Sequence, residues 1–182
     1  MLNPDDTFFV ADFHFDHKNI IRYCDRPFRS VEEMNTVLLS RYNEVVKDDS
    51  TVYFVGDMAF GRGSHPPKWW LTQLRGHIVY LKGSHDKGIT PAEVSTCQES
   101  VVLDTGIGRV LVIHEPQKIP LEWGGWTIHG HTHDKRLLNR QRRRICVSVE
   151  AINYRPISLK QIREAIQRGQ SNVQRELSEV RR

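Results

Sequence analysis

Short runs of apolar residues, most of them β-branched or aromatic, recur along the whole chain, and polar segments separate them. The runs are too short for helices, and they are too continuously apolar for strands that expose one side to water. Such runs are typical of strands that are buried on both faces. We therefore predict strands at Thr7–Ala11, Thr51–Val55, His77–Leu81, Ser100–Leu103, Arg109–Ile113, Trp126–Ile128 and Ile145–Val149.

Helical patterns lie between and after these strands. Two segments begin with a Ser that is followed three residues later by Glu or Gln, which is the spacing of a capping box, and both continue with apolar residues at helical spacing. A weaker pattern begins with a proline pair. We predict three helices. The first begins after Ser30 and has Glu33 in its capping box, the second covers Pro67–Leu74, and the third begins at Ser158 with Gln161 and ends at Gly169.

The order of these elements predicts the domain organisation. The first half alternates strand and helix, whereas residues 100–149 are mostly strand, with a turn at Asp104-Thr105-Gly106. This mixture favours two sheets packed face to face with helices outside. No repeat or linker interrupts the pattern, so we predict one domain over residues 1–169 and a polar tail or frayed helix over residues 170–182.

Composition excludes several classes of protein. The chain has 182 residues, of which 38% are hydrophobic and 26% charged, which excludes disordered and fibrous proteins. Its three cysteines are scattered and lack Cys-x-x-Cys spacing, so neither a disulfide scaffold nor a thiolate zinc site is expected. The apolar run near the N-terminus is too short for a signal peptide or a membrane span. We therefore expect a cytoplasmic protein without membrane contact.

Clusters of polar residues directly follow five of the predicted strands. In α/β sheets, ligands bind beyond the carboxyl ends of the strands, so these clusters are expected to converge. Two of them place two metal-ligand residues at a spacing of two, and on extended backbone both side chains would point the same way. The clusters are Asp12-Phe13-His14, Gly56-Asp57, Gly83-Ser84-His85-Asp86, His114-Glu115 and Gly130-His131-Thr132-His133.

The order of these clusters resembles that of the calcineurin-like metallophosphoesterases over roughly residues 7–150. A looser resemblance to the small stand-alone prokaryotic and viral members extends to Phe15–Ile20 and Arg26–Phe28. The resemblance implies a four-layer α/β/β/α sandwich of two mixed sheets flanked by helices. This architecture agrees with the two packed sheets that the element order favours.

The resemblance also implies a centre with two divalent metal ions and a catalytic imidazole. His85 would stand beside the leaving group, oriented by Asp86, and Asp57 would bridge the two ions. The other ligands would divide into Asp12, His14 and His133 for the first ion, and His114 and His131 with Ser84 for the second.

Ser84 departs from the family pattern, which usually has Asn at this position. A hydroxyl group is shorter than an amide and is a poorer metal ligand. We therefore predict weaker occupancy of the second metal site.

The ligand types predict the chemistry. Carboxylate and imidazole ligands without thiolate suit Mn²⁺, Fe or Zn²⁺, and ligand type alone leaves the choice open. We take Mn²⁺ first, with Fe, Zn²⁺ or Ni²⁺ as alternatives. A hydroxide bridging two such ions would hydrolyse a phosphodiester or a phosphomonoester, and His85 would protonate the leaving oxygen. The alternative is a catalytically weakened binding module with the same fold, in which Ser84 marks the first lost ligand.

Three further residues are candidates for substrate binding. His17 and Arg26 follow the first cluster, and Lys87 follows Asp86. Arg26 has the forked guanidinium group that binds phosphate in a bidentate manner, and Lys87 could contact the phosphate from the opposite side.

The formal charge of +4 conceals an uneven distribution. Residues 1–134 hold 13 Lys/Arg and 18 Asp/Glu, whereas residues 135–182 hold 13 Lys/Arg and 4 Asp/Glu, with the run Arg140–Arg144. The run is either a solvated surface or an electrostatic footprint for a phosphate-rich partner such as a nucleotide or nucleic acid. Charge alone leaves both interpretations open, and the sequence indicates no oligomeric state.

Overall fold

The computed structural model of the chain describes residues 2–61, 63–86 and 97–168 and contains two five-stranded mixed sheets. In the first sheet the neighbouring strands are parallel, except that β10 pairs antiparallel with β1. Its spatial order is β10 (Ile157–Ser158), β1 (Thr7–Val10), β2 (Thr51–Val55), β3 (His77–Leu81) and β4 (Cys97–Gln98).

The second sheet has a parallel centre and antiparallel edges. β6, β7 and β9 run parallel to one another, and β5 and β8 pair antiparallel at the two edges. Its order is β5 (Ser100–Asp104), β6 (Arg109–Ile113), β7 (Trp126–His129), β9 (Arg144–Cys146) and β8 (Leu138–Asn139).

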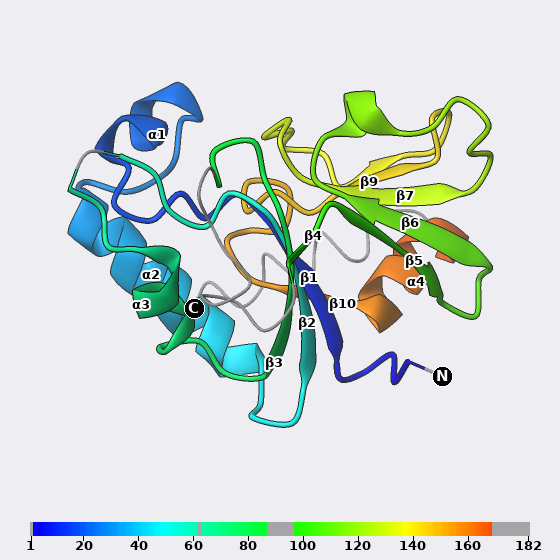
Figure 1. Cartoon of the computed structure of the whole chain (residues 1–182), viewed down its shortest axis with the longest axis horizontal. Helices are drawn as coiled ribbons and strands as arrows, with labels where there is room; N and C mark the ends of the chain where they lie inside the picture. The colour runs from blue at the N-terminus through cyan, green and yellow to red at the C-terminus, as the bar shows by residue number, and fades with distance from the viewer. Residues whose placement is uncertain (1, 62, 87–96, 169–182) are drawn as a thin grey trace.

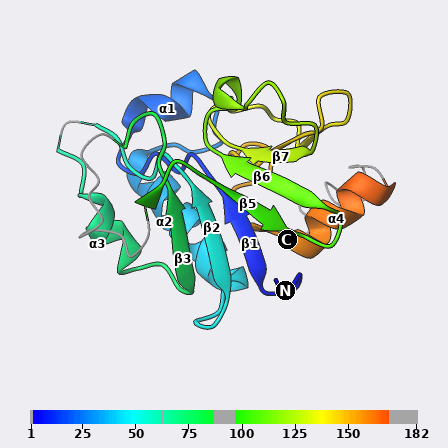
Figure 2. The same ribbon diagram turned by 45° about the vertical axis from the view of Figure 1, so that its right-hand side comes forward.

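Helices flank the two sheets. Figures 1 and 2 show α2 and α3 on the side of the first sheet that faces away from the second sheet, and α4 on the opposite side. The predicted α/β sandwich of two mixed sheets flanked by helices is thereby confirmed. The described helices are α1 (Lys18–Tyr23), α2 (Val31–Val45), α3 (Pro67–Leu71), α4 (Leu159–Arg168) and the 3₁₀ turn η1 (Pro116–Lys118).

The capping pairs form at both predicted helix starts. Ser30 Oγ accepts a hydrogen bond from the Glu33 backbone N–H at 3.1 Å and thereby begins α2. At α4 the bonding is reciprocal, because Ser158 Oγ accepts from the Gln161 N–H while Gln161 Oε1 accepts from the Ser158 N–H. The predicted C-terminus of this helix at Gly169, and the tail after it, lie outside the described residues.

The two sheets meet at the carboxyl ends of β1 and β9. Beyond β1, Ala11 forms a parallel bridge with Ser148, and its N–H donates to Val147 O at 2.9 Å. The predicted strand Ile145–Val149 is therefore a regular strand only to Cys146, and the following residues leave β9 to pair with Ala11. This junction brings the residues after both strands to one place.

The core at this junction is aromatic. The buried ring of Phe13 packs edge-on against Phe15, Phe54 and Tyr42, with centroids 5.0, 5.1 and 6.1 Å apart. Edge-to-face geometry fixes such rings more precisely than burial of area alone. The backbone on either side of Phe13, which carries Asp12 and His14, is thereby held rigidly.

Within the described residues, no helix is both long enough and apolar enough to cross a membrane.

Candidate metal centre

The polar clusters that follow the strands converge where the two sheets meet. Six of their side chains form two groups whose possible metal-ligand atoms lie within 4.8 Å of one another. The first group follows β1 and β7, and the second follows β2, β6 and β7. The groups are Asp12, His14 and His133, and Asp57, His114 and His131.

Asp57 lies between the two groups. Its Oδ2 is 3.7 Å from His14 Nε2 of the first group and 3.3 Å from His114 Nε2 of the second. Asp12 Oδ1 lies 3.9 Å from His14 Nε2 and 4.0 Å from His133 Nε2. Asp12 Oδ1 also lies 4.0 Å from His114 Nε2 of the second group, so the two groups adjoin through both carboxylates.

Several of these ligand atoms are buried without a hydrogen-bond partner. Asp12 Oδ1, His14 Nε2 and His114 Nε2 are such atoms, and their residues are 0%, 2% and 1% exposed. A buried polar atom without a partner costs free energy, so these atoms need a partner that is not a protein group. Divalent cations are partners that carboxylate oxygens and imidazole nitrogens both accept, and the residues present therefore fit a metal centre.

The other atoms of these ligands are held by the protein. His114 Nδ1 lies 2.7 Å from Val55 O, which turns Nε2 toward the centre. Asp12 Oδ2 accepts hydrogen bonds from Ser148 Oγ at 2.6 Å and from the His131 N–H at 2.9 Å, which leaves Oδ1 for a cation. Partners of this kind orient metal ligands and raise their basicity.

The His133 ring is held by an acidic residue that the sequence reasoning missed. His133 Nδ1 lies 3.0 Å from Glu150 Oε1, and Glu150 is held in turn by Arg26. Ser148 and Glu150 lie at the carboxyl end of β9 and its extension, where the placement of polar residues after strands could have found them.

In the structure, the guanidinium group of Arg26 bonds to protein groups and is not placed to bind phosphate. Its side chain is buried, Nε donates to Glu150 Oε1 at 2.8 Å, and Nη1 and Nη2 donate to the carbonyl oxygens of Phe13 and Asp12 at 2.8 and 2.7 Å. The predicted role in substrate binding is therefore wrong. Arg26 positions the backbone of the first ligand cluster.

Most of the ligands have left-handed backbone. The φ angles of Asp12, His14, Asp57, His131 and His133 are 62°, 49°, 58°, 70° and 49°. The expectation of extended backbone at the two spaced pairs is therefore wrong, and His131 and His133 belong to different groups. Such φ values cost free energy in residues other than glycine, and they cluster at functional sites where the surrounding structure enforces them.

Glycines let backbone approach the ligands closely. A Cβ at Gly130 would lie 2.7 Å from Asp12 Oδ2, and one at Gly83 would overlap Asp57 Oδ1. Both glycines belong to clusters that the sequence singled out, and their function here is to leave room for the two carboxylates.

The segment after β3 brings Ser84 and His85 to the second group. Ser84 Oγ donates to Asp57 Oδ2 at 3.2 Å and lies 3.4 Å from His131 Nδ1. The His85 N–H donates to Asp57 Oδ1 at 2.8 Å, and the exposed His85 ring lies 5.5 Å from the His14 ring, centroid to centroid. Both side chains therefore border the centre.

Asp86 forms hydrogen bonds with backbone N–H groups. This buried carboxylate accepts through Oδ2 from the N–H groups of Asp57 and Gly83, both at 2.8 Å. Asp86 was predicted to orient the His85 imidazole, but these contacts do not include that ring. Asp86 instead joins the segments after β2 and β3.

The remaining substrate-binding candidates are His17 and Lys87. His17 is partly buried, and its ring lies 6.0 Å from the His14 ring, which places it beside the first group. Lys87 lies outside the described residues.

Burial and charge shift the pKa values of the histidines in opposite directions. Burial lowers the pKa of His14 to about 2, so its ring is neutral. Burial would also lower the pKa of His114, but the Asp57 carboxylate, whose Oδ2 lies 3.3 Å from Nε2, and the charge of Asp12 raise it to about 9. Metal ligands must be deprotonated, so cation binding is expected to release a proton from His114.

Comparison with known proteins gives a clear relative. No family model matches the chain. The chain is 38% identical over 169 residues to the uncharacterized protein MJ1445 of Methanocaldococcus jannaschii, and the match covers 89% of this chain and 92% of that protein. The chain belongs to the MJ1445 family.

One solved structure shares the fold, and a second aligns more weakly. The protein of unknown function AQ665 from Aquifex aeolicus aligns with a TM-score of 0.67 and 24% identity, over 88% of this chain and 98% of that protein. A structure described as a novel archaeal phosphodiesterase aligns with a TM-score of 0.45 and 15% identity, over 78% of this chain and 81% of that one. The first of these matches agrees with the sandwich described above.

Proposed function

We propose that this protein is a calcineurin-like, metal-dependent phosphoesterase that hydrolyses phosphodiesters or phosphomonoesters. The observation that carries the proposal is the pair of adjoining Asp/His groups around Asp57, in which buried ligand atoms face one another without hydrogen-bond partners. Two divalent cations held there would supply Lewis acidity toward a phosphoryl group and an activated water.

The protein's own residues would hold the centre and move one proton. Asp57 would join the two cations, with Asp12, His14 and His133 on one side and His114 and His131 on the other. Ser84 would contribute its hydroxyl group at the second cation. The exposed imidazole of His85 would donate a proton to the departing oxygen, a contribution of roughly 10²–10⁴-fold for a positioned acid.

Manganese is the cation that we propose first, because the carboxylates of Asp12 and Asp57 are ligands that suit it. Iron, zinc and nickel would be accepted by the same donor set. The proposed setting is the cytoplasm.

A binding module without turnover is the second candidate, favoured by Ser84 alone. The contacts of Ser84 argue against it, because Ser84 Oγ points at Asp57 Oδ2 and His131 Nδ1 and so still faces the second group.

The deciding experiment uses metal-depleted protein that is reloaded with Mn²⁺. Bound manganese is counted by elemental analysis, and activity is measured on a panel of mono-, di- and cyclic phosphoesters. We expect more than one ion per chain, with the second site only partly occupied, and hydrolysis of at least one class. Two bound ions without hydrolysis of any ester would establish the binding module instead.

Two variants locate the activity at this site. His85→Asn should keep the bound metal and lose most turnover, especially on esters with poor leaving groups. The matched control is His77→Asn, because His77 is exposed at the amino end of β3 and His85 follows its carboxyl end. Full activity of His85→Asn would remove this residue from the mechanism.

A further inference from the structure

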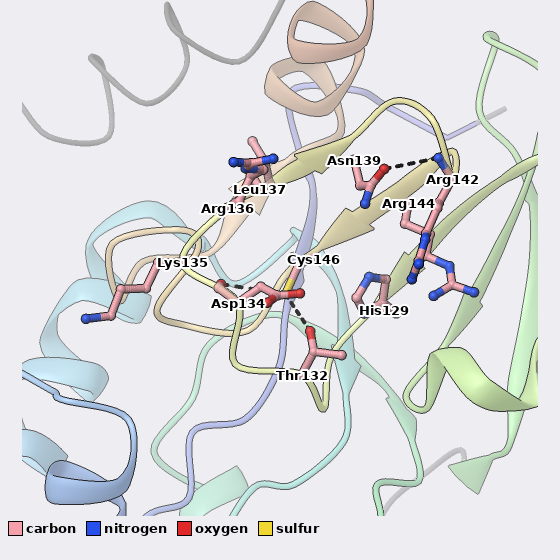
Figure 3. Close-up of a pocket in the computed structure, with 10 residues that line it drawn as sticks. All are labelled: His129, Thr132, Asp134, Lys135, Arg136, Leu137, Asn139, Arg142, Arg144 and Cys146. Carbon is pink, nitrogen blue, oxygen red and sulfur yellow. Dashed lines mark hydrogen bonds between the residues drawn. The ribbon is translucent and has the colours of Figure 1, made fainter.

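A basic pocket lies beside the metal centre. It has a volume of about 630 Å³ and is lined by residues of the segment 129–139 and of the β8–β9 hairpin. Figure 3 shows Lys135 and Arg136 toward one side of the pocket and Arg142 and Arg144 toward the other. One acidic residue, Asp134, also lines it, so basic groups outnumber acidic ones.

The structure separates the basic residues into those with structural contacts and those that face the pocket. Arg140 donates to the carbonyl oxygens of Ala165 and Ile166, and Arg143 donates to that of Gly124. These two arginines therefore hold neighbouring segments.

The pocket residues are held more loosely. Lys135 Nζ forms an exposed ion pair with Asp25 at 2.8 Å, and Arg144 Nη2 lies 3.5 Å from Pro116 O. The side chains of Arg136 and Arg142 are exposed, and neither forms an ion pair or side-chain hydrogen bond within the part of the chain that the structure describes. These two guanidinium groups are available to an anion.

The pocket and the metal centre share one segment of chain. Thr132 lines the pocket, while its neighbours His131 and His133 belong to the two metal groups. An anion in the pocket would therefore lie across one loop from the metal centre. A substrate with several phosphates would place one phosphate at the centre and another in the pocket.

Exposed aromatic rings border the centre as well. The Phe60 ring, 38% exposed, lies 4.4 Å from the His85 ring and 4.9 Å from the His17 ring, centroid to centroid. The His17 ring contacts Tyr23 at 6.2 Å, and Tyr23 is 64% exposed. Arg22 Cζ lies over the Tyr23 ring, 5.5 Å from its centroid, and the exposed parts of the Phe60 and Tyr23 rings are open to planar ligands.

We propose that the substrate of this site is single-stranded nucleic acid, an inference that rests on the proposed function. Backbone phosphates would contact Arg136 and Arg142, and bases would stack on Phe60 and Tyr23. Basic grooves combined with aromatic platforms are the usual way in which proteins bind single strands. A duplex keeps its base faces stacked internally, so the exposed rings favour an unpaired strand.

Binding is tested without turnover, on the full chain in the presence of EDTA. The probe is a fluorescein-labelled oligothymidylate of about 12 nucleotides, a length within the usual range of site sizes, and the readout is anisotropy over a salt series. We expect Arg136→Glu with Arg142→Glu to weaken binding at least tenfold and to flatten the salt dependence, by about 0.7 in log–log slope for each phosphate that is no longer neutralised.

The aromatic variants should behave differently from the charge variants. Phe60→Ala and Tyr23→Ala should each weaken binding roughly tenfold without changing the salt slope, because stacking releases no counterions. The matched charge control is Lys47→Glu, which lies just before the amino end of β2, at the opposite end of the sheet from the centre, and should bind like the unaltered protein.

The outcomes separate this inference from the proposed function. Hydrolysis of bis-p-nitrophenyl phosphate by Mn²⁺-loaded protein, together with oligothymidylate binding no tighter than that of a mononucleotide or of duplex DNA, would overturn the inference and leave the phosphoesterase. Equal weakening by Lys47→Glu would also overturn it. Tight oligonucleotide binding without hydrolysis of any ester would overturn both the substrate assignment and the proposed function.

Discussion

Arg26 and Glu150 are 124 positions apart in the sequence and form a buried ion pair, with Arg26 Nε 2.8 Å from Glu150 Oε1. The same carboxylate oxygen lies 3.0 Å from His133 Nδ1, so the pair holds a metal ligand in place. Arg26 also donates to the carbonyl oxygen of Asp12. The ion pair therefore supports two ligands of the first metal group, Asp12 and His133. Two of our predictions follow from it.

Arg26→Met should destabilise the protein by about 3–5 kcal/mol, because the buried Glu150 carboxylate loses the guanidinium group and keeps only the contact with His133. Chemical denaturation, followed by circular dichroism, measures the change in the free energy of unfolding. Lys135→Met is the control, since it breaks an exposed ion pair with Asp25 and should change stability little. Equal destabilisation by the two substitutions would contradict the assignment of Arg26 to a buried network.

Glu150→Gln should show a pH-dependent loss of stability in metal-free protein. Burial would raise the pKa of Glu150, but the hydrogen bond to His133 and the charge of Arg26 lower it from 4.5 to about 2. A lowered pKa stabilises the fold above pH 4.5, and this contribution is lost as the pH falls toward 2. Burial would lower the pKa of His133, but the contacts with Cys24 and Glu150 raise it from 6.5 to about 10, and that contribution is lost as the pH rises above 6.5. The stability difference between the unaltered protein and Glu150→Gln should therefore be largest between about pH 5 and 6.5, where Glu150 is ionised and His133 protonated, and it should shrink as the pH falls. A difference that is constant from pH 3 to pH 7 would rule out this linkage.

Gly83→Ala should reduce the number of bound metal ions, because it displaces Asp57, the proposed ligand of both. A Cβ at this position would overlap Asp57 Oδ1 and lie against the backbone of Asp57. The matched control is Gly124→Ala, because a Cβ there meets no atom within 4 Å. Elemental analysis after reloading with Mn²⁺ counts the bound ions, and normal stoichiometry in Gly83→Ala would show that the segment after β3 can move away without cost.

Ser84→Asn should raise the occupancy of the second metal site. Ser84 Oγ already lies 3.2 Å from Asp57 Oδ2, and an amide oxygen is both longer in reach and a better ligand than a hydroxyl group. Metal titration with turnover on a phosphodiester gives the comparison, and Ser84→Ala should shift both quantities in the opposite direction. Unchanged stoichiometry and turnover in Ser84→Asn would mean that position 84 does not limit the site.

Local patterns account for the elements and for the convergence of the site. The strands Thr51–Val55, His77–Leu81 and Arg109–Ile113 have the predicted bounds, because each is specified by its own run of apolar residues. Burial on both faces was predicted for all three, but in His77–Leu81 only the last two residues are buried. The short elements α1, β4, β8 and β10 were not predicted. Two-residue strands such as β8 and β10 carry too few residues for any periodicity, and their pairing is decided by the neighbouring strand.

By itself, the sequence determined which side chains follow the strands, and therefore that aspartates and histidines gather at one edge of the sandwich. Only the tertiary structure decided that Arg26 is buried against Glu150, that Asp86 bonds to backbone N–H groups, and that the ligand residues have left-handed backbone. The physical reason is one of range. Strand periodicity and helix capping act between residues a few positions apart, whereas these partners meet only because Ala11 and Ser148 join the two sheets and the left-handed backbone there turns each side chain to its place.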